Sequence, residues 1–163
     1  MSANPETTVP LKLTVNGAAR ELDVEPRRSL ADVLRRDLGH TGTTVGCDSG
    51  HCGSCTVLVD GEPARSCLML AVQAETTAVE TVESLDHDET GAALRRAFSE
   101  NFALQCGFCT PGMLVLCTAL LRSGTPTRDG ITECVSANLC RCTGYGSIVD
   151  AVEQAARTGG DES

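Results

Sequence analysis

Residues 45–55 read VGCDSGHCGSC, and Cys67 follows Cys55 after eleven intervening residues. The resulting spacing, C-x4-C-x2-C-x11-C, is the ligand pattern of a plant-type [2Fe–2S] cluster. Three glycines in this stretch allow positive φ angles, so the loop can wrap an inorganic core with its N–H groups pointing inward. A zinc site or a loop of reduced cysteines is the alternative, although zinc sites more often pair two short C-x2-C segments. The predicted ligands are Cys47, Cys52, Cys55 and Cys67.

The distant fourth cysteine is explained by a predicted hairpin. Residues 56–59 (TVLV) have the composition of a strand, Asp60-Gly61 is a hairpin turn, and residues 64–66 are expected to return. Such a hairpin brings Cys67 back beside Cys55.

The rest of the first half predicts a small sheet that grasps one helix. Leu11, Leu13 and Val15 alternate with polar residues and lead into the hairpin signal Asn16-Gly17. Ser29 is an expected N-cap, and apolar residues then recur at helical spacing until Gly39. The predicted elements are strands at 11–15, 22–24 and 78–82 and a helix at 30–38. This pattern predicts an α+β domain over residues 1–84.

The second half, residues 85–163, shows helical periodicity instead. Residues 83–90 are acidic and are predicted to form a solvated linker. Thr110 is an expected N-cap followed by Pro111, and Asp150 an expected capping partner of Ser147. The predicted helices cover residues 94–102, 110–121, 131–139 and 147–156, and the tail from Arg157 is expected to fray. Together these features predict a four-helix unit.

Two cysteine pairs precede the second and fourth of these predicted helices, at Cys106/Cys109 and Cys140/Cys142. Helix N-termini carry partial positive charge and free N–H groups, which favour anionic thiolates. Taken alone, the pattern C-x2-C…C-x-C is compatible with tetrahedral zinc or with a second [2Fe–2S] cluster.

Composition and charge exclude several functional classes. The 163-residue chain has a formal net charge of −9 and a pI of about 4.7, which argues against partners such as nucleic acid or an anionic membrane surface. No apolar run is long enough to span a bilayer. Residues 1–10 contain no apolar export signal, so a cytoplasmic location with reduced, metal-bound thiolates is expected. The chain carries no nucleotide-binding loop and no acid–base constellation, so electron transfer is favoured over bond-making catalysis.

Two further motifs, QCGFCTPGM at 105–113 and NLCRCTGY at 138–145, extend the pattern of the first loop. In this order the three segments closely resemble the small iron–sulfur subunit of the molybdenum hydroxylases, the xanthine dehydrogenase and carbon monoxide dehydrogenase family. The resemblance covers residues 11–156. It implies a β-grasp ferredoxin-type domain followed by a four-helix [2Fe–2S]-binding domain. It also implies that the second cluster is held by Cys106, Cys109, Cys140 and Cys142, with Gln105 and Cys142 against a molybdopterin.

The same resemblance implies the partners and the electron route. Electrons would pass from a large molybdopterin-binding subunit through the second cluster and then the first to FAD on a medium subunit or to another acceptor. The assembly would be a heterotrimer that can dimerise, in which this chain is the non-catalytic part of an oxidoreductase. A free-standing two-cluster ferredoxin is one alternative, and a binding or regulatory module with structural zinc in its helical half is another.

The remaining cysteines and polar residues have structural interpretations. Cys117 and Cys134 are expected to be small buried apolar residues on helices rather than ligands. His51, beside Cys52, is expected to be an exposed non-ligand, although proton coupling to cluster reduction is the alternative. Arg141 either balances the charge of a cluster or faces solvent.

Overall fold

The computed structural model describes residues 8–158. Within them, five strands form one sheet in the order β2-β1-β5-β3-β4. The hairpin β1–β2 turns at Asn16 and Gly17, whose φ angles are 51° and 78°, and the hairpin β3–β4 turns at Asp60 and Gly61, with 51° and 86°. Two consecutive positive φ angles match the twist of antiparallel strands, so both predicted hairpins are confirmed. The strand bounds are β1 Val9–Val15, β2 Ala18–Val24, β3 Thr56–Val59, β4 Glu62–Arg65 and β5 Ala78–Glu80.

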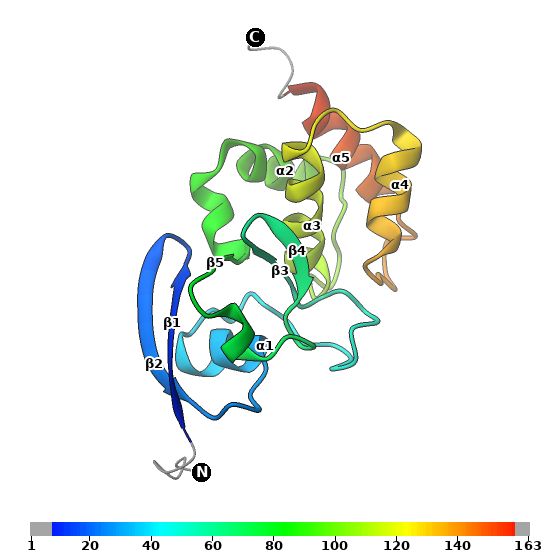
Figure 1. The fold of residues 1–163 in the computed structure, drawn as a ribbon. Coiled ribbons are helices and arrows are strands. Elements are labelled where there is room, and N and C mark those ends of the chain that lie inside the picture. Colours follow the sequence, from blue (N-terminus) through cyan, green and yellow to red (C-terminus); the bar gives the residue numbers. More distant parts are fainter. Residues whose placement is uncertain (1–7, 159–163) are drawn as a thin grey trace.

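Besides the 3-10 helix Ala71–Ala74, one helical segment packs against this sheet (Figure 1). Ser29 caps it as predicted, because its hydroxyl accepts a hydrogen bond of 3.1 Å from the Asp32 amide. The segment is not one α-helix over residues 30–38, however. It begins as α1, Leu30–Asp32, and continues as a π-helical turn over Val33–Asp37, where the Leu38 amide bonds to the Val33 carbonyl at 3.1 Å. Leu30, Val33 and Leu34 are fully buried against the sheet.

The prediction of a solvated linker at residues 83–90 is wrong. Val82–His87 form a 3-10 helix, and Leu85 is completely buried in the core of the helical half. The acidic residues have structural partners: the Glu83 carboxylate accepts a bond from the Gly42 amide at 2.9 Å, and Asp88 caps the next helix through the Gly91 amide at 2.7 Å. The acidic composition therefore reflects capping and pairing rather than solvation.

The second half contains helices α2 Glu89–Glu100, α3 Thr110–Arg122, α4 Arg128–Ser136 and α5 Gly146–Thr158. Figure 1 shows them above the sheet, with α3 next to β3. Helix α2 packs on α3 and α5, and α4 packs on the same two helices. Their shared core includes Phe98, Met113, Ile131 and Ile148. No helix within residues 8–158 is both long and apolar enough to cross a membrane.

Several predicted helix ends differ from the structure. Cys109, not Thr110, is the N-cap of α3, although Pro111 lies in the first turn as predicted. Asp150 does not cap α5; its carboxylate pairs with Arg128 at 2.7 Å, because the facing helix α4 places a cation beside it. Helix α4 ends at Ser136, so Leu139 lies in a loop. Arg157 is helical rather than frayed, and residues 159–163 of the predicted tail lie outside the described residues.

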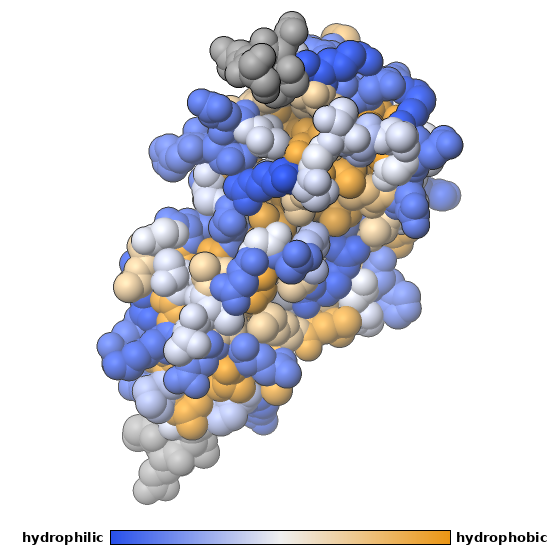
Figure 2. Space-filling model, turned by 45° about the horizontal axis from the view of Figure 1, so that its top comes forward, coloured by the Kyte–Doolittle hydropathy of each residue, from blue (hydrophilic) through white to orange (hydrophobic). Residues whose placement is uncertain are grey.

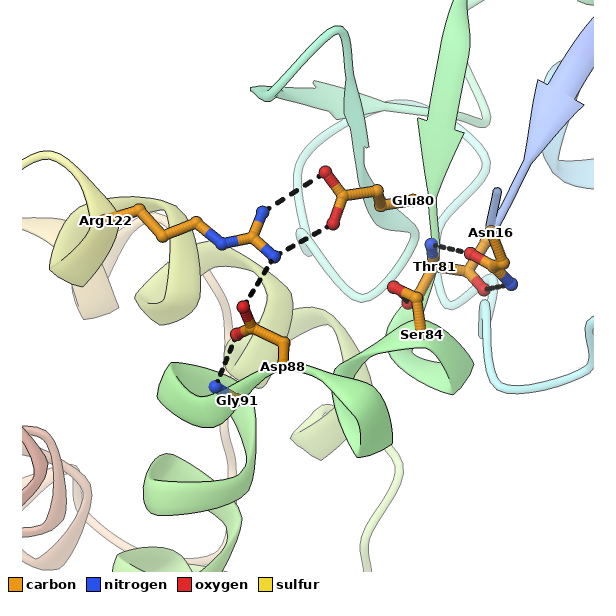
Figure 3. A network of polar contacts seen from close by, with 7 residues as sticks. All are labelled: Asn16, Glu80, Thr81, Ser84, Asp88, Gly91 and Arg122. Carbon is orange, nitrogen blue, oxygen red and sulfur yellow. Dashed lines mark hydrogen bonds and ion pairs between the residues drawn. The ribbon is translucent and has the colours of Figure 1, made fainter. Parts of the chain in front are cut away.

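A polar network joins the sheet to the helices (Figure 3). The Arg122 guanidinium, at the end of α3, bonds both Glu80 oxygens of β5 at 3.2 and 3.0 Å and approaches Asp88 at 3.2 Å. Hydrogen bonding to Glu80 raises the pKa of Arg122. Nearby, the Asn16 side chain accepts a bond from the Thr81 amide at 2.9 Å. The bidentate geometry orients β5 relative to α2 and α3.

Gly112, in the first turn of α3, is predicted to be intolerant of a side chain. A Cβ there would lie 2.6 Å from the Ser54 carbonyl oxygen and 2.7 Å from that of Gly53, both main-chain atoms of the cysteine loop. Gly112→Ala should therefore destabilise the protein by about 1–3 kcal/mol through overpacking. In the matched variant Gly130→Ala the nearest atom is 3.5 Å away, so the higher helix propensity of alanine should stabilise by up to about 1 kcal/mol. Thermal unfolding of both variants measures the contrast, and equal midpoints would contradict it.

Candidate metal centres

The loop around Cys47 curls so that main-chain amides face its sulfur. Asp48, Gly50 and Gly53 have φ angles of 53°, 76° and 77°, which turn the chain back on itself. As a result the amides of Ser49 and Cys52 lie 3.5 and 3.3 Å from the Cys47 Sγ. These hydrogen bonds, with that from Cys52 the strongest, lower the pKa of the Cys47 thiol to about 6. The loop thus favours an anionic sulfur at this position.

The hairpin places Cys67 beside Cys55, as its sequence predicted. The Ser66 amide and hydroxyl bond to the Cys55 carbonyl at 3.3 and 2.6 Å and hold the returning strand in register. The two thiols are hydrogen-bonded to one another, and burial is the main cause that raises the pKa of Cys67 to about 11. Unlike Cys47, both side chains are buried. We call Cys47, Cys52, Cys55 and Cys67 the first set.

The second set, Cys106, Cys109, Cys140 and Cys142, also consists of two close pairs. The Cys106 and Cys142 sulfurs are 3.5 Å apart and both residues are exposed, whereas Cys109 is hydrogen-bonded to Cys140. Burial raises the pKa of Cys109 to about 12. Burial acts in the same direction on Cys140, but hydrogen bonds led by the Thr143 hydroxyl outweigh it and lower the pKa of Cys140.

Tyr145 organises the second of these loops, a role that no sequence pattern indicated. Its hydroxyl accepts a bond of 2.8 Å from the Cys140 amide and donates one of 3.1 Å to the Asn138 carbonyl. Its backbone has a positive φ of 68°. A tyrosine three residues after Cys142 gives no periodicity signal, so only the position of its ring reveals this role.

The four thiols of each set fit a [2Fe–2S] cluster better than they fit a single metal ion such as zinc. Each set of four thiols is arranged as two pairs, as expected for two irons that share bridging sulfides and take two cysteines each. A tetrahedral zinc site instead requires four ligands around one point. Within residues 8–158 no three His, Cys, Asp or Glu side chains converge in that way.

The two residues expected near a pterin lie together on the surface. The side-chain amide of Gln105 donates a hydrogen bond of 3.2 Å to the Cys142 main-chain carbonyl, and both residues are exposed. Large apolar side chains are also exposed close to the cysteines in sequence, namely Leu68, Phe102, Leu104, Phe108 and Leu139. Figure 2 shows such hydrophobic surface interspersed among polar side chains in both halves of the molecule.

The other residues singled out from the sequence lie apart from both sets or on the surface. Cys117 is fully buried in α3, as predicted, and is hydrogen-bonded to the half-buried Cys134 of α4. His51 is exposed and its Nδ1 lies 3.2 Å from the Ser49 hydroxyl. Arg141 is exposed, which agrees with the interpretation that it faces solvent.

The two sets of cysteines are connected by direct hydrogen bonds between their loops. The Thr44 hydroxyl donates to the Phe108 carbonyl at 2.8 Å, and Phe108 lies between Cys106 and Cys109. The Leu139 amide, next to Cys140, donates to the Cys52 carbonyl at 2.8 Å. Arg65 donates to the Ala137 carbonyl at 2.7 Å. Both segments of the second set are therefore anchored to the first half of the chain, a feature that no local sequence pattern indicated.

Comparisons with known proteins agree with this geometry. Residues 13–94 match the family described as "2Fe-2S iron-sulfur cluster binding domain", and residues 81–153 match "[2Fe-2S] binding domain". The chain is 53% identical to the 6-hydroxypseudooxynicotine dehydrogenase complex subunit beta of Paenarthrobacter nicotinovorans, over 89% of this chain and 92% of that protein. It is 52% identical to the caffeine dehydrogenase subunit gamma of a Pseudomonas species, over 91% of each. The crystal structure of quinoline 2-oxidoreductase from Pseudomonas putida 86 contains a chain that superposes with a TM-score of 0.86 at 51% identity, covering 94% of this chain and 98% of that one.

Proposed function

The chain belongs to the small [2Fe–2S] subunits of the molybdenum hydroxylases, and on this basis we propose that its eight paired cysteines hold two clusters that relay electrons. As a member of this family it is the electron-transfer part of an oxidoreductase complex. The ligand assignment is supported by one observation above all, the arrangement of each cysteine set as two close pairs. When bound, a [2Fe–2S] cluster accepts and donates one electron at a time.

The protein's own residues would stabilise and tune these carriers. The amides of Ser49 and Cys52 aim at Cys47, and hydrogen bonds to cluster sulfur raise a reduction potential. At the second set, the Thr143 hydroxyl lies 3.2 Å from the Cys140 sulfur and acts in the same sense. The net charge of −9 opposes this effect by making reduction less favourable.

We infer the direction of electron flow from exposure. Cys106, Cys142 and Gln105 are exposed and have apolar neighbours, which suits a surface that receives a molybdopterin-bearing partner. Electrons would then pass from the second set to the first set across the hydrogen-bonded loops. An FAD-binding medium subunit would be the next acceptor, in a heterotrimer that can dimerise.

The domain organisation follows the same division. We propose a β-grasp ferredoxin-type domain over residues 1–84 and a four-helix [2Fe–2S]-binding domain over residues 85–163. The two principal hydrophobic cores support this boundary, because one uses residues 11–79 and the other, apart from Leu58, uses residues 85–155. Ten free cysteines suit a reducing compartment, so a cytoplasmic location is proposed.

A free-standing two-cluster ferredoxin is the second candidate, since the chain contains both cysteine sets. The exposed Phe102, Phe108 and Leu139 disfavour it, because a freely diffusing carrier gains nothing from exposing large apolar side chains to water. Native co-purification separates the two functions. Recovery of the chain without any molybdopterin protein would favour the ferredoxin.

The purified protein is expected to contain about four irons and about four sulfides per chain. Reduction should produce two distinct rhombic [2Fe–2S] signals in the electron paramagnetic resonance (EPR) spectrum, because the two sets differ in burial and hydrogen bonding. Metal analysis and EPR of the same sample make the test. Zinc in the helical half, or only two irons, would refute the two-cluster assignment.

A further inference from the structure

Asn138 combines complete burial with an unsatisfied side chain. Its relative exposure is 0%, and within residues 8–158 neither its Oδ1 nor its Nδ2 has a hydrogen-bond partner. Burying an amide without partners destabilises a protein, and an apolar residue of similar size would avoid that cost. The position therefore calls for an explanation other than core packing.

The Asn138 side chain occupies the space beside Gly53 that a side chain at residue 53 would fill. A Cβ on Gly53 would lie only 1.8 Å from the Asn138 Oδ1 and 2.6 Å from its Cγ. The Oδ1 thus rests against the Gly53 Cα, directly after the predicted ligand Cys52. The next residue on the helical side, Leu139, donates its amide to the Cys52 carbonyl at 2.8 Å. Asn138 packs against the Cys52–Gly53 peptide and Leu139 is hydrogen-bonded to it.

Rigid contacts hold Asn138 itself in place on the helical side. The Tyr145 hydroxyl donates to the Asn138 carbonyl at 3.1 Å and accepts from the Cys140 amide at 2.8 Å. Arg65 bonds the carbonyl of the preceding residue, Ala137, at 2.7 Å. A displacement of Asn138 would therefore move Cys140, and the same side chain abuts the loop of the first set.

We propose that Asn138 is a positioning residue whose buried amide fixes the separation and the relative orientation of the two iron–sulfur loops. This inference rests on the proposed function, since the positioned groups are the two clusters. Its neutrality matters as well as its volume, because the unpaired amide lies between two sites that would hold anionic clusters. A neutral dipole is tolerated there, whereas a charge would shift both potentials.

The first experiment compares Asn138→Ala with Asn101→Ala in the assembled complex. Asn101, at the end of α2, bonds Ala97 and Gln154 and takes no part in the contact between the loops. Asn138→Ala should retain about four irons, change the magnetic splitting between the two reduced clusters, and slow electron passage between them about 10-fold or more. Asn101→Ala should leave splitting and rate unchanged. EPR of the fully reduced complex and rapid-freeze kinetics provide the two readouts.

A charge variant tests polarity independently of distance. Asn138→Asp keeps the shape of the side chain, and where its buried carboxyl group ionises, at high pH, the negative charge should lower the reduction potentials of both clusters. Asn101→Asp is the matched control and should move neither potential. EPR-monitored redox titration at neutral and at high pH measures these shifts, which report how close residue 138 lies to both clusters.

A glycine pair approaches the same contact from the other side. Gly53→Ala places a methyl group into Asn138. Gly61→Ala has similar backbone strain, with φ angles of 77° for Gly53 and 86° for Gly61, but its methyl group would meet no atom of the described part of the chain within 4 Å. Only Gly53→Ala should change the splitting. The double variant Gly53→Ala/Asn138→Ala should recover it in part, because contact with the Ala137 carbonyl at 2.7 Å remains.

The outcomes separate this inference from the proposed function. Wild-type protein with fewer than two clusters would refute the proposed function. Wild-type protein with two clusters, together with an unaltered splitting and unaltered potentials in the Asn138 variants, would overturn the inference alone. Loss of iron from Asn138→Ala but not from Asn101→Ala would also overturn it, by assigning Asn138 to cluster retention.

Discussion

Cys142→Ser is expected to leave the complex with about two irons per chain instead of about four and to abolish one of its two EPR signals. Cys142 pairs with Cys106 at 3.5 Å on the surface of the second set, so its loss removes one of the two thiolates that would hold an iron. Reoxidation of the molybdenum subunit through a flavin-side acceptor should stop as well. Iron analysis, EPR and turnover with that acceptor measure the three effects together.

Cys134→Ser is the matched control for this variant. Cys134 is a half-buried cysteine of α4, six residues before Cys140, and its thiol contacts Cys117 rather than either set. The serine variant should keep both EPR signals and full turnover. Wild-type turnover by Cys142→Ser would disprove the electron route proposed above, and loss of a signal from Cys134→Ser would disprove the ligand assignment.

Phe98→Ala is expected to reduce the free energy of unfolding by about 3–5 kcal/mol. Phe98, on α2, is 1% exposed and is among the largest fully buried side chains of the helical core. Truncation leaves a cavity there, since other members of the same core, such as Leu94, Met113 and Ile148, are held on helices. Denaturant or thermal unfolding, followed by circular dichroism, measures the loss.

The same substitution four residues later provides the control. Phe102 is 83% exposed, so Phe102→Ala should change stability by less than about 0.5 kcal/mol. In the assembled complex, by contrast, it should weaken association if Phe102 lies in the partner interface. Comparable destabilisation of the isolated chain by both variants would contradict the description of the core.

The elements that could be predicted from the sequence have local causes. The hairpins at Asn16-Gly17 and Asp60-Gly61 follow from residues that accept positive φ angles, and the second hairpin suffices to bring Cys67 to Cys55. The helical half follows from the periodicity of its apolar residues. Gln105 and Cys142 could be placed near one another only through the family resemblance, and the structure joins them by a hydrogen bond of 3.2 Å.

The features that could not be predicted depend on contacts between distant segments. The acidic composition of residues 83–90 predicts a solvated segment. Leu85 is nevertheless buried, because it packs into the core formed by the helices. The π-helical turn at Val33–Asp37 leaves the apolar pattern of the segment unchanged. The roles of Tyr145 and Asn138 arise from hydrogen bonds and close packing around Cys140 and Gly53, which no local pattern encodes.

Adjacent residues of β3 contribute to two different cores. Val57 packs with the sheet and α1, whereas Leu58 packs with the helices, since successive side chains of a strand point to opposite faces. The first and second halves of the chain therefore cannot be exchanged independently between relatives. A chimera that joins the first half of one relative to the second half of another at residue 84 would transplant Leu58 into a foreign helical core. Such hybrids should fold well only when strand β3 and the helices that form the core around Leu58 come from the same relative.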